Sequence, residues 1–266
     1  MGRAAARAAM TLLATAVACA PALREPPRLD ELTGGAERAA GRPGAEVAEE
    51  AESLYSRRTI PAVRRAVGLW LEAAASEAER VPALVGAARA RVWLAVRERT
   101  GEARRAAAVS AVQVAQLCKL DAPQEPRCDY WLAVALGVQA RERRSTGLYA
   151  LPSIIELLDR VAGTVPDLDH GGPDRVLSLL YLRAPGWPLG PGDDDLGLDH
   201  ARRAVSVAPD YPPNRLALAE ALEATGDLEA AGVARDEAAR SARTWIERGD
   251  PDAEEWLEQA IRATRE

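Results

Sequence analysis

Apolar residues recur at helical spacing over most of this chain. Val63, Ala66, Val67 and Trp70 follow the i, i+3, i+4, i+7 rule and mark one buried stripe. The segment 81–99 repeats the pattern. No stretch alternates apolar and polar residues between turn signals, as a half-buried strand would. The pattern therefore predicts an all-α protein.

Glycine and proline cut this pattern into segments of about 12–22 residues, a length that suits the paired helices of a solenoid. The breaks fall at Pro61, Pro82, Gly101, Pro123/Pro126, Gly147/Pro152, Gly163/Pro166, Pro185 to Gly192, Pro209 to Pro213, Gly226 and Gly249/Pro251.

Internal repetition supports a solenoid. The dipeptide Thr-Gly recurs at Thr100-Gly101, Thr146-Gly147 and Thr225-Gly226, each time between two helical patterns, and the clearest unit spans 209–238. In that unit Gly226 closes a turn, and Ala231 and Ala238 follow it on the second helix. The unit resembles a tetratricopeptide (TPR) repeat, which implies paired helices that approach closely at alanine. We therefore expect residues 44–266 to form an irregular TPR-like right-handed α-solenoid of about four to five helix pairs. A compact helical bundle is the alternative.

Residues 1–18 have the features of a secretory signal. Two arginines precede an apolar run that is shorter than the roughly 20 residues needed to span a bilayer. Small residues lead directly into Cys19, and this arrangement resembles the lipobox of bacterial lipoproteins. The resemblance implies a lipid on Cys19 and, because Ala20 replaces a retention aspartate, anchoring at the outer membrane on the periplasmic side. An ordinary signal peptide cut after Ala18 or Ala20 and a cytosolic N-terminus are the alternatives.

The segment 19–43 is rich in proline and glycine, which predicts a flexible tether. No later apolar run reaches membrane-spanning length. We therefore expect the protein to contact the membrane by its N-terminal lipid only.

The charge balance disfavours one class of function. The chain has 34 basic and 40 acidic side chains, a formal net charge of −6 and a pI near 5.3. A nucleic-acid-binding surface needs a basic patch that neutralises phosphates. We therefore predict no nucleic-acid partner.

Two cysteines remain once Cys19 carries lipid. Cys118 and Cys128 flank a proline-containing turn, and an even pair in an exported protein predicts a disulfide. Closing a loop this short stabilises a fold by about 3 kcal/mol in the chain-entropy model. A catalytic or metal-binding pair is the alternative, but no histidine or further cysteine lies nearby in the sequence to complete it.

The sequence offers few groups for catalysis. It contains no phosphate-binding glycine loop, no Gly-x-Ser-x-Gly elbow and no His-Glu-x-x-His helix. With only His170 and His200, a metal site of several imidazoles is impossible. We interpret both histidines as turn or packing residues rather than acids or bases, and Asp193 to Asp195 as a helix start rather than a Ca²⁺ site. We therefore predict no enzyme, no metal and no cofactor.

The most unusual stretch is the Gly/Pro-rich loop 184–195, because long insertions between helices often carry function. At its centre, Trp187 either binds a partner or plugs a groove between helices. We expect Tyr181 and Tyr211 beside it, and name all three as candidate partner- or ligand-binding residues. The other tryptophans fall within helical stripes and are expected in the core: Trp70, Trp93, Trp131, Trp245 and Trp256.

Short motifs in a fixed order carry a narrower resemblance. Asp129-Tyr130-Trp131 opens a helix, Leu151-Pro152 introduces the next, Asp167 to Gly172 precede a third, and Asp199 to Ala204 follow the long loop. Over roughly residues 45–245 this order resembles the periplasmic TPR lipoproteins of the TatT family, which are associated with tripartite ATP-independent periplasmic (TRAP) transporters. The resemblance implies a helical scaffold that docks an extracytoplasmic solute-binding protein and forms a homo-oligomer.

These features predict a non-enzymatic, lipid-anchored periplasmic scaffold for protein–protein interaction, and the family resemblance adds an accessory role in TRAP-type solute transport. The alternative is a helical small-ligand binder, with Trp187, Tyr181 and Tyr211 lining an aromatic cleft. An enzyme is a third hypothesis, which the shortage of catalytic groups disfavours.

Overall fold

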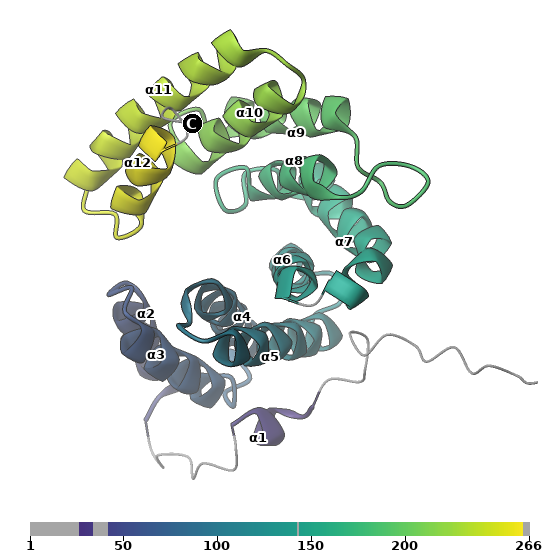
Figure 1. The fold of residues 1–266 in the computed structure, drawn as a ribbon. Coiled ribbons are helices and arrows are strands. Elements are labelled where there is room, and N and C mark those ends of the chain that lie inside the picture. The colour runs from purple at the N-terminus through teal and green to yellow at the C-terminus, as the bar shows by residue number, and fades with distance from the viewer. Residues whose placement is uncertain (1–26, 34–41, 143, 263–266) are drawn as a thin grey trace, which may run out of the picture.

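The computed structural model describes residues 27–33, 42–142 and 144–262 (Figure 1). The regular secondary structure of these residues consists of helices alone. The predicted all-α class is confirmed. The helices are α1 (Leu29–Leu32), α2 (Gly44–Tyr55), α3 (Ile60–Ala73), α4 (Arg80–Arg97), α5 (Gly101–Asp121), α6 (Pro126–Glu142), α7 (Arg144–Thr164), α8 (Gly172–Arg183), α9 (Asp194–Val207), α10 (Pro212–Ala224), α11 (Leu228–Glu247) and α12 (Ala253–Arg262).

The helices pack as consecutive pairs, α2 with α3, α4 with α5, α6 with α7, α8 with α9 and α10 with α11. Most even-numbered helices also contact the next even-numbered helix, as α4 does with α6, α8 with α10 and α10 with α12. This two-layer stacking along one direction is the arrangement of an α-solenoid. The described part of the chain thus holds five pairs and a terminal α12, at the upper end of the predicted range.

Small residues allow these helices to approach closely. Trp70 on α3 is buried and lies against Gly86 on α4, where an added Cβ would come within 2.5 Å of the indole ring. Most other buried positions of α4, including Ala87 and Ala90, are also alanine. Trp93 is buried as predicted. The core is therefore built from large side chains on one helix resting against small ones on the next.

Helix starts follow the capping signals in the sequence. Thr100, Asp193 and Asp227 each precede a helix, and each side chain accepts a hydrogen bond from a backbone N–H of the first turn. For Asp193 the distance from Oδ1 to the amide nitrogen of Leu196 is 3.0 Å. This contact agrees with the interpretation of the aspartate run as a helix start.

The predicted helix break at Gly147/Pro152 is wrong. Helix α7 continues from Arg144 to Thr164 with Pro152 inside it. Proline removes one helical hydrogen bond, but the C-terminal part of α7 buries Ile154 and Leu158 in the core. This burial keeps the helix continuous despite the proline.

A disulfide joins α5 to α6 where the two helices meet. Cys118 and Cys128 are both buried and their Cα atoms lie 5.5 Å apart. Beside them, Lys119 forms an ion pair with the buried carboxylate of Asp129, which also accepts a hydrogen bond of 3.0 Å from Arg160 of α7. The only lysine of the chain therefore helps to neutralise a buried acid that links three helices.

The signal segment and Cys19 lie outside the described residues. Within the segment predicted as a tether, residues 29–32 form the short helix α1, and Leu29 and Leu32 are partly buried against the core. Among the described helices, none combines the length and apolar content needed to cross a bilayer.

Candidate functional site

The pairs follow one another around an arc, and the last helix comes round to face the first pairs (Figure 1). Helix α12 packs on α11 and α10, while its start and the turn before it reach the other end of the solenoid through side chains. The side where the two ends meet is the candidate functional site.

A strained turn between α7 and α8 forms one wall of this site. Asp169, His170 and Gly171 all have positive φ angles, of 51°, 57° and 80°, a conformation that disfavours residues with a Cβ. Arg175 holds the turn, because its guanidinium donates to the Asp169 carboxylate (2.6 Å) and to Oδ1 of Asn214 (2.8 Å). The Asn214 amide, fully buried, donates in turn to the His170 carbonyl (2.8 Å).

The same turn is tied to the preceding pair of the solenoid. The Tyr130 hydroxyl on α6 donates to the Asp169 carboxylate at 2.5 Å. Burial, followed by the charge of Asp169, raises the pKa of Tyr130 well above 10. The phenol therefore stays protonated and keeps its hydrogen bond over the whole physiological pH range.

Four aromatic rings gather against this turn, and we call them the aromatic cluster: His170, Tyr211, Trp245 and Trp256. The His170 ring stacks on Tyr211 with centroids 4.5 Å apart, and the two indoles meet Tyr211 edge-on at 5.4 and 5.2 Å. The rings come from the α7–α8 turn, the α9–α10 turn, α11 and α12. Each residue is at least partly exposed, and burial raises the pKa of Tyr211.

The opposite wall comes from the first two pairs and is rich in arginine. Arg58 and Arg89 both lie over the Tyr55 ring, 3.9 and 4.4 Å from its centroid, and Arg97 lies over Trp93 at 4.8 Å. Arg58 also donates to the Tyr55 carbonyl at 2.9 Å. Arg58 and Arg97 are therefore oriented by aromatic residues of their own pairs, and Arg89 by one of the preceding pair.

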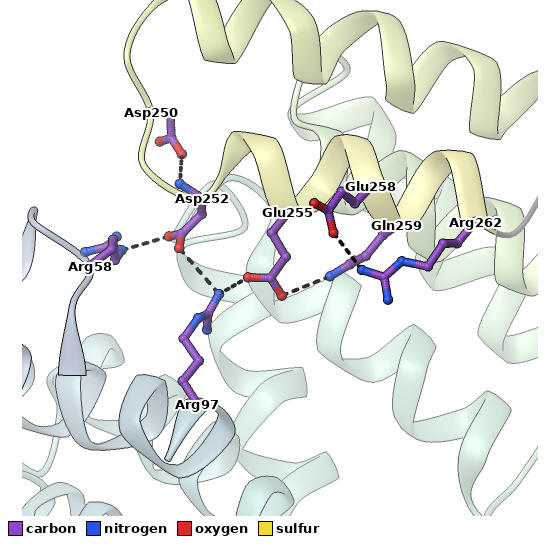
Figure 2. Close-up of polar contacts among 8 residues, drawn as sticks. All are labelled: Arg58, Arg97, Asp250, Asp252, Glu255, Glu258, Gln259 and Arg262. Atoms are coloured by element: carbon purple, nitrogen blue, oxygen red, sulfur yellow. Dashed lines mark hydrogen bonds and ion pairs between the residues drawn. The ribbon is translucent and has the colours of Figure 1, made fainter. Parts of the chain in front are cut away.

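Ion pairs join the two walls, and Figure 2 shows them. The Asp252 carboxylate accepts from Nε of Arg58 at 2.8 Å and from Arg97 at 3.4 Å, and Arg97 also pairs with Glu255. Asp250 accepts from the Asp252 amide at 2.9 Å and so fixes the turn. We call Arg58, Arg97, Asp252 and Glu255 the closing ion pairs, because they connect residues up to 194 positions apart.

The structure does not bring together the three aromatic residues named from the sequence. Trp187 is 90% exposed at the tip of its loop. Tyr181 stacks on His200, with centroids 5.5 Å apart, at the foot of that loop. Tyr211 belongs to the aromatic cluster on the α9–α10 turn. Among the described residues, no ring contact joins Trp187 to either tyrosine.

The two histidines lie in different surroundings. His200 is buried, with Nδ1 2.7 Å from the Asp174 carboxylate, which also lies 3.4 Å from Arg203. His170 occupies the strained turn. Over the described ranges, no group of three or more histidine, cysteine, aspartate or glutamate side chains is placed to hold a metal ion.

Sequence reasoning missed the aromatic cluster and the closing ion pairs. The helical stripes predict Trp245 and Trp256 in the core, but both are only partly buried, and so is Trp131. One signal was available: Tyr211, Trp245 and Trp256 all lie next to turns that follow a second helix of a pair. In a solenoid such turns lie along one edge, so these rings are neighbours.

Comparison with known proteins identifies the fold but no family. No family model matches the chain, and no curated protein matches it in sequence. Among solved structures, it is similar to a thermophilic TPR protein from Thermus thermophilus, with a TM-score of 0.57 and 18% identity over 82% of this chain and 98% of that one. The fold is therefore a TPR-like all-α solenoid, as the sequence predicted.

Proposed function

We propose that this chain is a non-enzymatic scaffold that binds a protein partner on the side where its two ends meet. The observation that carries the proposal is the pairing of the aromatic cluster with an arginine-rich wall on a TPR-like solenoid. Tyrosine, tryptophan and arginine are the residues most enriched at the energetic centres of protein interfaces. Solenoids present such residues on extended inner surfaces.

The test is capture of partners with the full chain in its native host. Cross-linked wild-type protein and a Trp256→Ala variant are compared by quantitative mass spectrometry, with thermal unfolding as a check that the variant folds. We expect at least one protein to be enriched with the wild type and lost with the variant. Enrichment of none, from membrane and soluble fractions alike, contradicts the proposal.

We further propose that the scaffold is a periplasmic lipoprotein. The support is the small-residue run before Cys19 and the apolar segment ahead of it. Intact mass of the membrane-fractionated protein tests this directly. We expect loss of residues 1–18 and addition of acyl chains, both abolished by Cys19→Ala; an unprocessed soluble chain refutes the anchor, the periplasmic location and the outer-membrane assignment together.

The resemblance to TatT lipoproteins supports a finer proposal: the partner is an extracytoplasmic solute-binding protein of a TRAP transporter, and the scaffold is a homo-oligomer. Co-purification with the solute-binding proteins encoded in the same genome tests the partner, and sedimentation velocity tests the oligomer. A captured partner of another class refutes the transporter role but leaves the scaffold in place.

Small-ligand binding is the second candidate, and the aromatic cluster is the observation that favours it. The aromatic cluster takes the place of the predicted cleft of Trp187, Tyr181 and Tyr211, because these three side chains do not lie together. Trp245 and Trp256 both contact Tyr211, so a ligand there is expected to change tryptophan fluorescence. A thermal-shift and fluorescence screen of small solutes in which no compound stabilises the wild type over Trp256→Ala refutes this candidate.

A further inference from the structure

The loop between α8 and α9 is fixed by its own backbone hydrogen bonds, and we call it the platform. Its base is held by backbone hydrogen bonds from Gly192 to Pro185 (2.9 Å) and from Asp193 to Tyr181 (3.0 Å), and its tip by one from Leu189 to Gly186 (3.0 Å). Gly192 permits this closure, because a Cβ there would lie 2.2 Å from the Ala184 carbonyl oxygen.

This platform presents large apolar side chains to solvent. Trp187 is 90% exposed and Leu189 is 74% exposed, and Leu196 in the first turn of α9 is also exposed. We call these three residues the apolar tip. An ordered loop that holds an indole and a leucine away from the core gains nothing in stability from them, whereas exposed apolar groups of this kind mark contact surfaces.

Exposed apolar residues continue along the neighbouring first-to-second helix turns. Tyr149 lies near the start of α7 and Leu228 at the start of α11, and both are largely exposed. In Figure 1 the start of α7, the α8–α9 loop and the α10–α11 turn follow one another along one outer side of the solenoid. The surface is therefore separate from the site where the ends meet.

The charge around the apolar tip is mostly negative, and the next arginines along α9, Arg202 and Arg203, lie 3.9 and 3.4 Å from the carboxylates of Asp199 and Asp174. Residues 184–201 contain four aspartates and no lysine or arginine. Asp194 and Asp195 are exposed, and no ion pair within the described part of the chain involves either of them. The arginine before the loop, Arg183, is already neutralised by two contacts with Glu220, of 2.8 and 2.7 Å.

The neighbouring turn extends the acidic field. Asp227 and Glu229 lie beside Leu228, and the next arginine, Arg235, pairs with Glu223. A second copy of this chain docked edge to edge would bring the same acidic surface against this one, and an anionic bilayer would also be repelled. A basic protein surface is the occupant that matches both the charge and the indole.

We propose that the apolar tip is a second docking surface, and that its partner is a protein with an apolar socket ringed by lysine or arginine. Trp187 fills the socket, and Asp194 and Asp195 face the basic ring. This surface acts independently of the side where the ends meet, so the scaffold holds one partner at each.

The experiment compares four full-length proteins: wild type, Trp187→Ala, Asp194→Asn/Asp195→Asn, and Leu120→Ala. Leu120 is an exposed leucine at the end of α5, far along the chain from the tip, and serves as the matched control. Proteins cross-linked to the wild type in the native host and lost with Trp187→Ala are purified, and their affinities are measured at 50 and 500 mM salt.

We expect Trp187→Ala to weaken binding by about tenfold or more, as for an interface hot spot. We expect the double asparagine variant to weaken it several-fold and to flatten its salt dependence, while Leu120→Ala binds as the wild type does. Equal affinity of all four proteins, or no protein lost with Trp187→Ala, overturns the proposal. If every partner captured in the native host is lost with Trp256→Ala and none is lost with Trp187→Ala, the proposal is overturned and the proposed function stands.

Two further arms exclude the other occupants. Flotation with vesicles of phosphatidylethanolamine and phosphatidylglycerol is expected to show no difference between the wild type and Trp187→Ala. Sedimentation is expected to show the same oligomeric state for both. A Trp187-dependent flotation assigns the tip to lipid, and a Trp187-dependent oligomer assigns it to a second copy; either result overturns the proposal.

Discussion

Replacing Asp252 with alanine is expected to open the solenoid. This carboxylate accepts hydrogen bonds from two arginines of the other end, Arg58 at 2.8 Å and Arg97 at 3.4 Å. The three side chains are between 17% and 27% exposed, so solvent weakens these pairs without abolishing them. Because α12 reaches the first pairs through side chains, few other contacts compensate for the loss.

The magnitude follows from the kind of contact that is lost. A hydrogen bond to a charged group contributes about 1.5–3 kcal/mol, and the partial exposure of this group and the weak geometry of the second contact lower that sum. Arg97 keeps Glu255, and both arginines keep their aromatic neighbours. We therefore expect Asp252→Ala to favour the open form by about 2 kcal/mol relative to the wild type.

Glu258→Ala is the matched control, because Glu258 lies on the same helix and, among the described residues, forms an ion pair only with Arg262, one turn away. Small-angle X-ray scattering is expected to show a larger radius of gyration for Asp252→Ala, and hydrogen exchange to accelerate in the turns around residues 58 and 252. Glu258→Ala should change neither. At 1 M salt, where the screening length is about 3 Å, the radius of gyration and the exchange rates of the wild type should approach those of Asp252→Ala. If Asp252→Ala scatters and exchanges as the wild type does, the closing ion pairs do not hold the ends together.

Three further predictions concern stability. Gly86→Ala should lower the free energy of unfolding by about 1–3 kcal/mol, because the added Cβ would collide with Trp70. Gly137 has open space around it, so Gly137→Ala should raise the free energy of unfolding by up to about 1 kcal/mol. Equal effects of the two substitutions in urea titrations would refute this packing. Asn214→Ala should cost about 2–4 kcal/mol in the same assay, since it removes one hydrogen-bond partner of Arg175 and the donor to the carbonyls of His170 and Ala204. A loss below about 1 kcal/mol contradicts that role. Burial raises the pKa of Tyr130 and Tyr211 above 10, so the unfolded chain releases these protons first, and stability should fall above pH 10 by up to about 1.4 kcal/mol per pH unit for each tyrosine. Tyr211→Phe should reduce this slope, and urea midpoints that do not change between pH 9 and 11 would contradict it.

The helix pairs could be predicted from the sequence because each depends on local spacing. The stripe through Val63 and Trp70, the cap at Asp193 and the turn at Gly226 all act within one or two helical turns. The break predicted at Pro152 is wrong because a proline signals a break locally, while the burial of Leu158 that overrides it is a tertiary contact. Local rules therefore determine the class and the number of pairs, but not every boundary.

The candidate site could not be predicted in the same way. Arg58 and Asp252 meet only if small rotations between five successive pairs accumulate to bring the ends together, and no residue spacing encodes that sum. The stacking of His170 on Tyr211 depends on a turn in which Asp169 and His170 adopt a positive φ, which tertiary contacts from Arg175 and Asn214 impose. The geometry of the site therefore depends on the accumulated curvature of the solenoid and on backbone strain that tertiary contacts impose on the α7–α8 turn.

Closure of the solenoid and partner binding on the side where its two ends meet are coupled, and the sign of that coupling depends on the partner. A partner that binds only when the ends are apart has to overcome the closing ion pairs, and about 2 kcal/mol corresponds to a roughly 30-fold loss of apparent affinity. Asp252→Ala would then tighten its binding. A partner that recognises the closed arrangement, with the aromatic cluster and Arg97 presented together, would bind the variant more weakly. Binding at the apolar tip, which shares no residue with the closing ion pairs, should be the same for the wild type and the variant in either case.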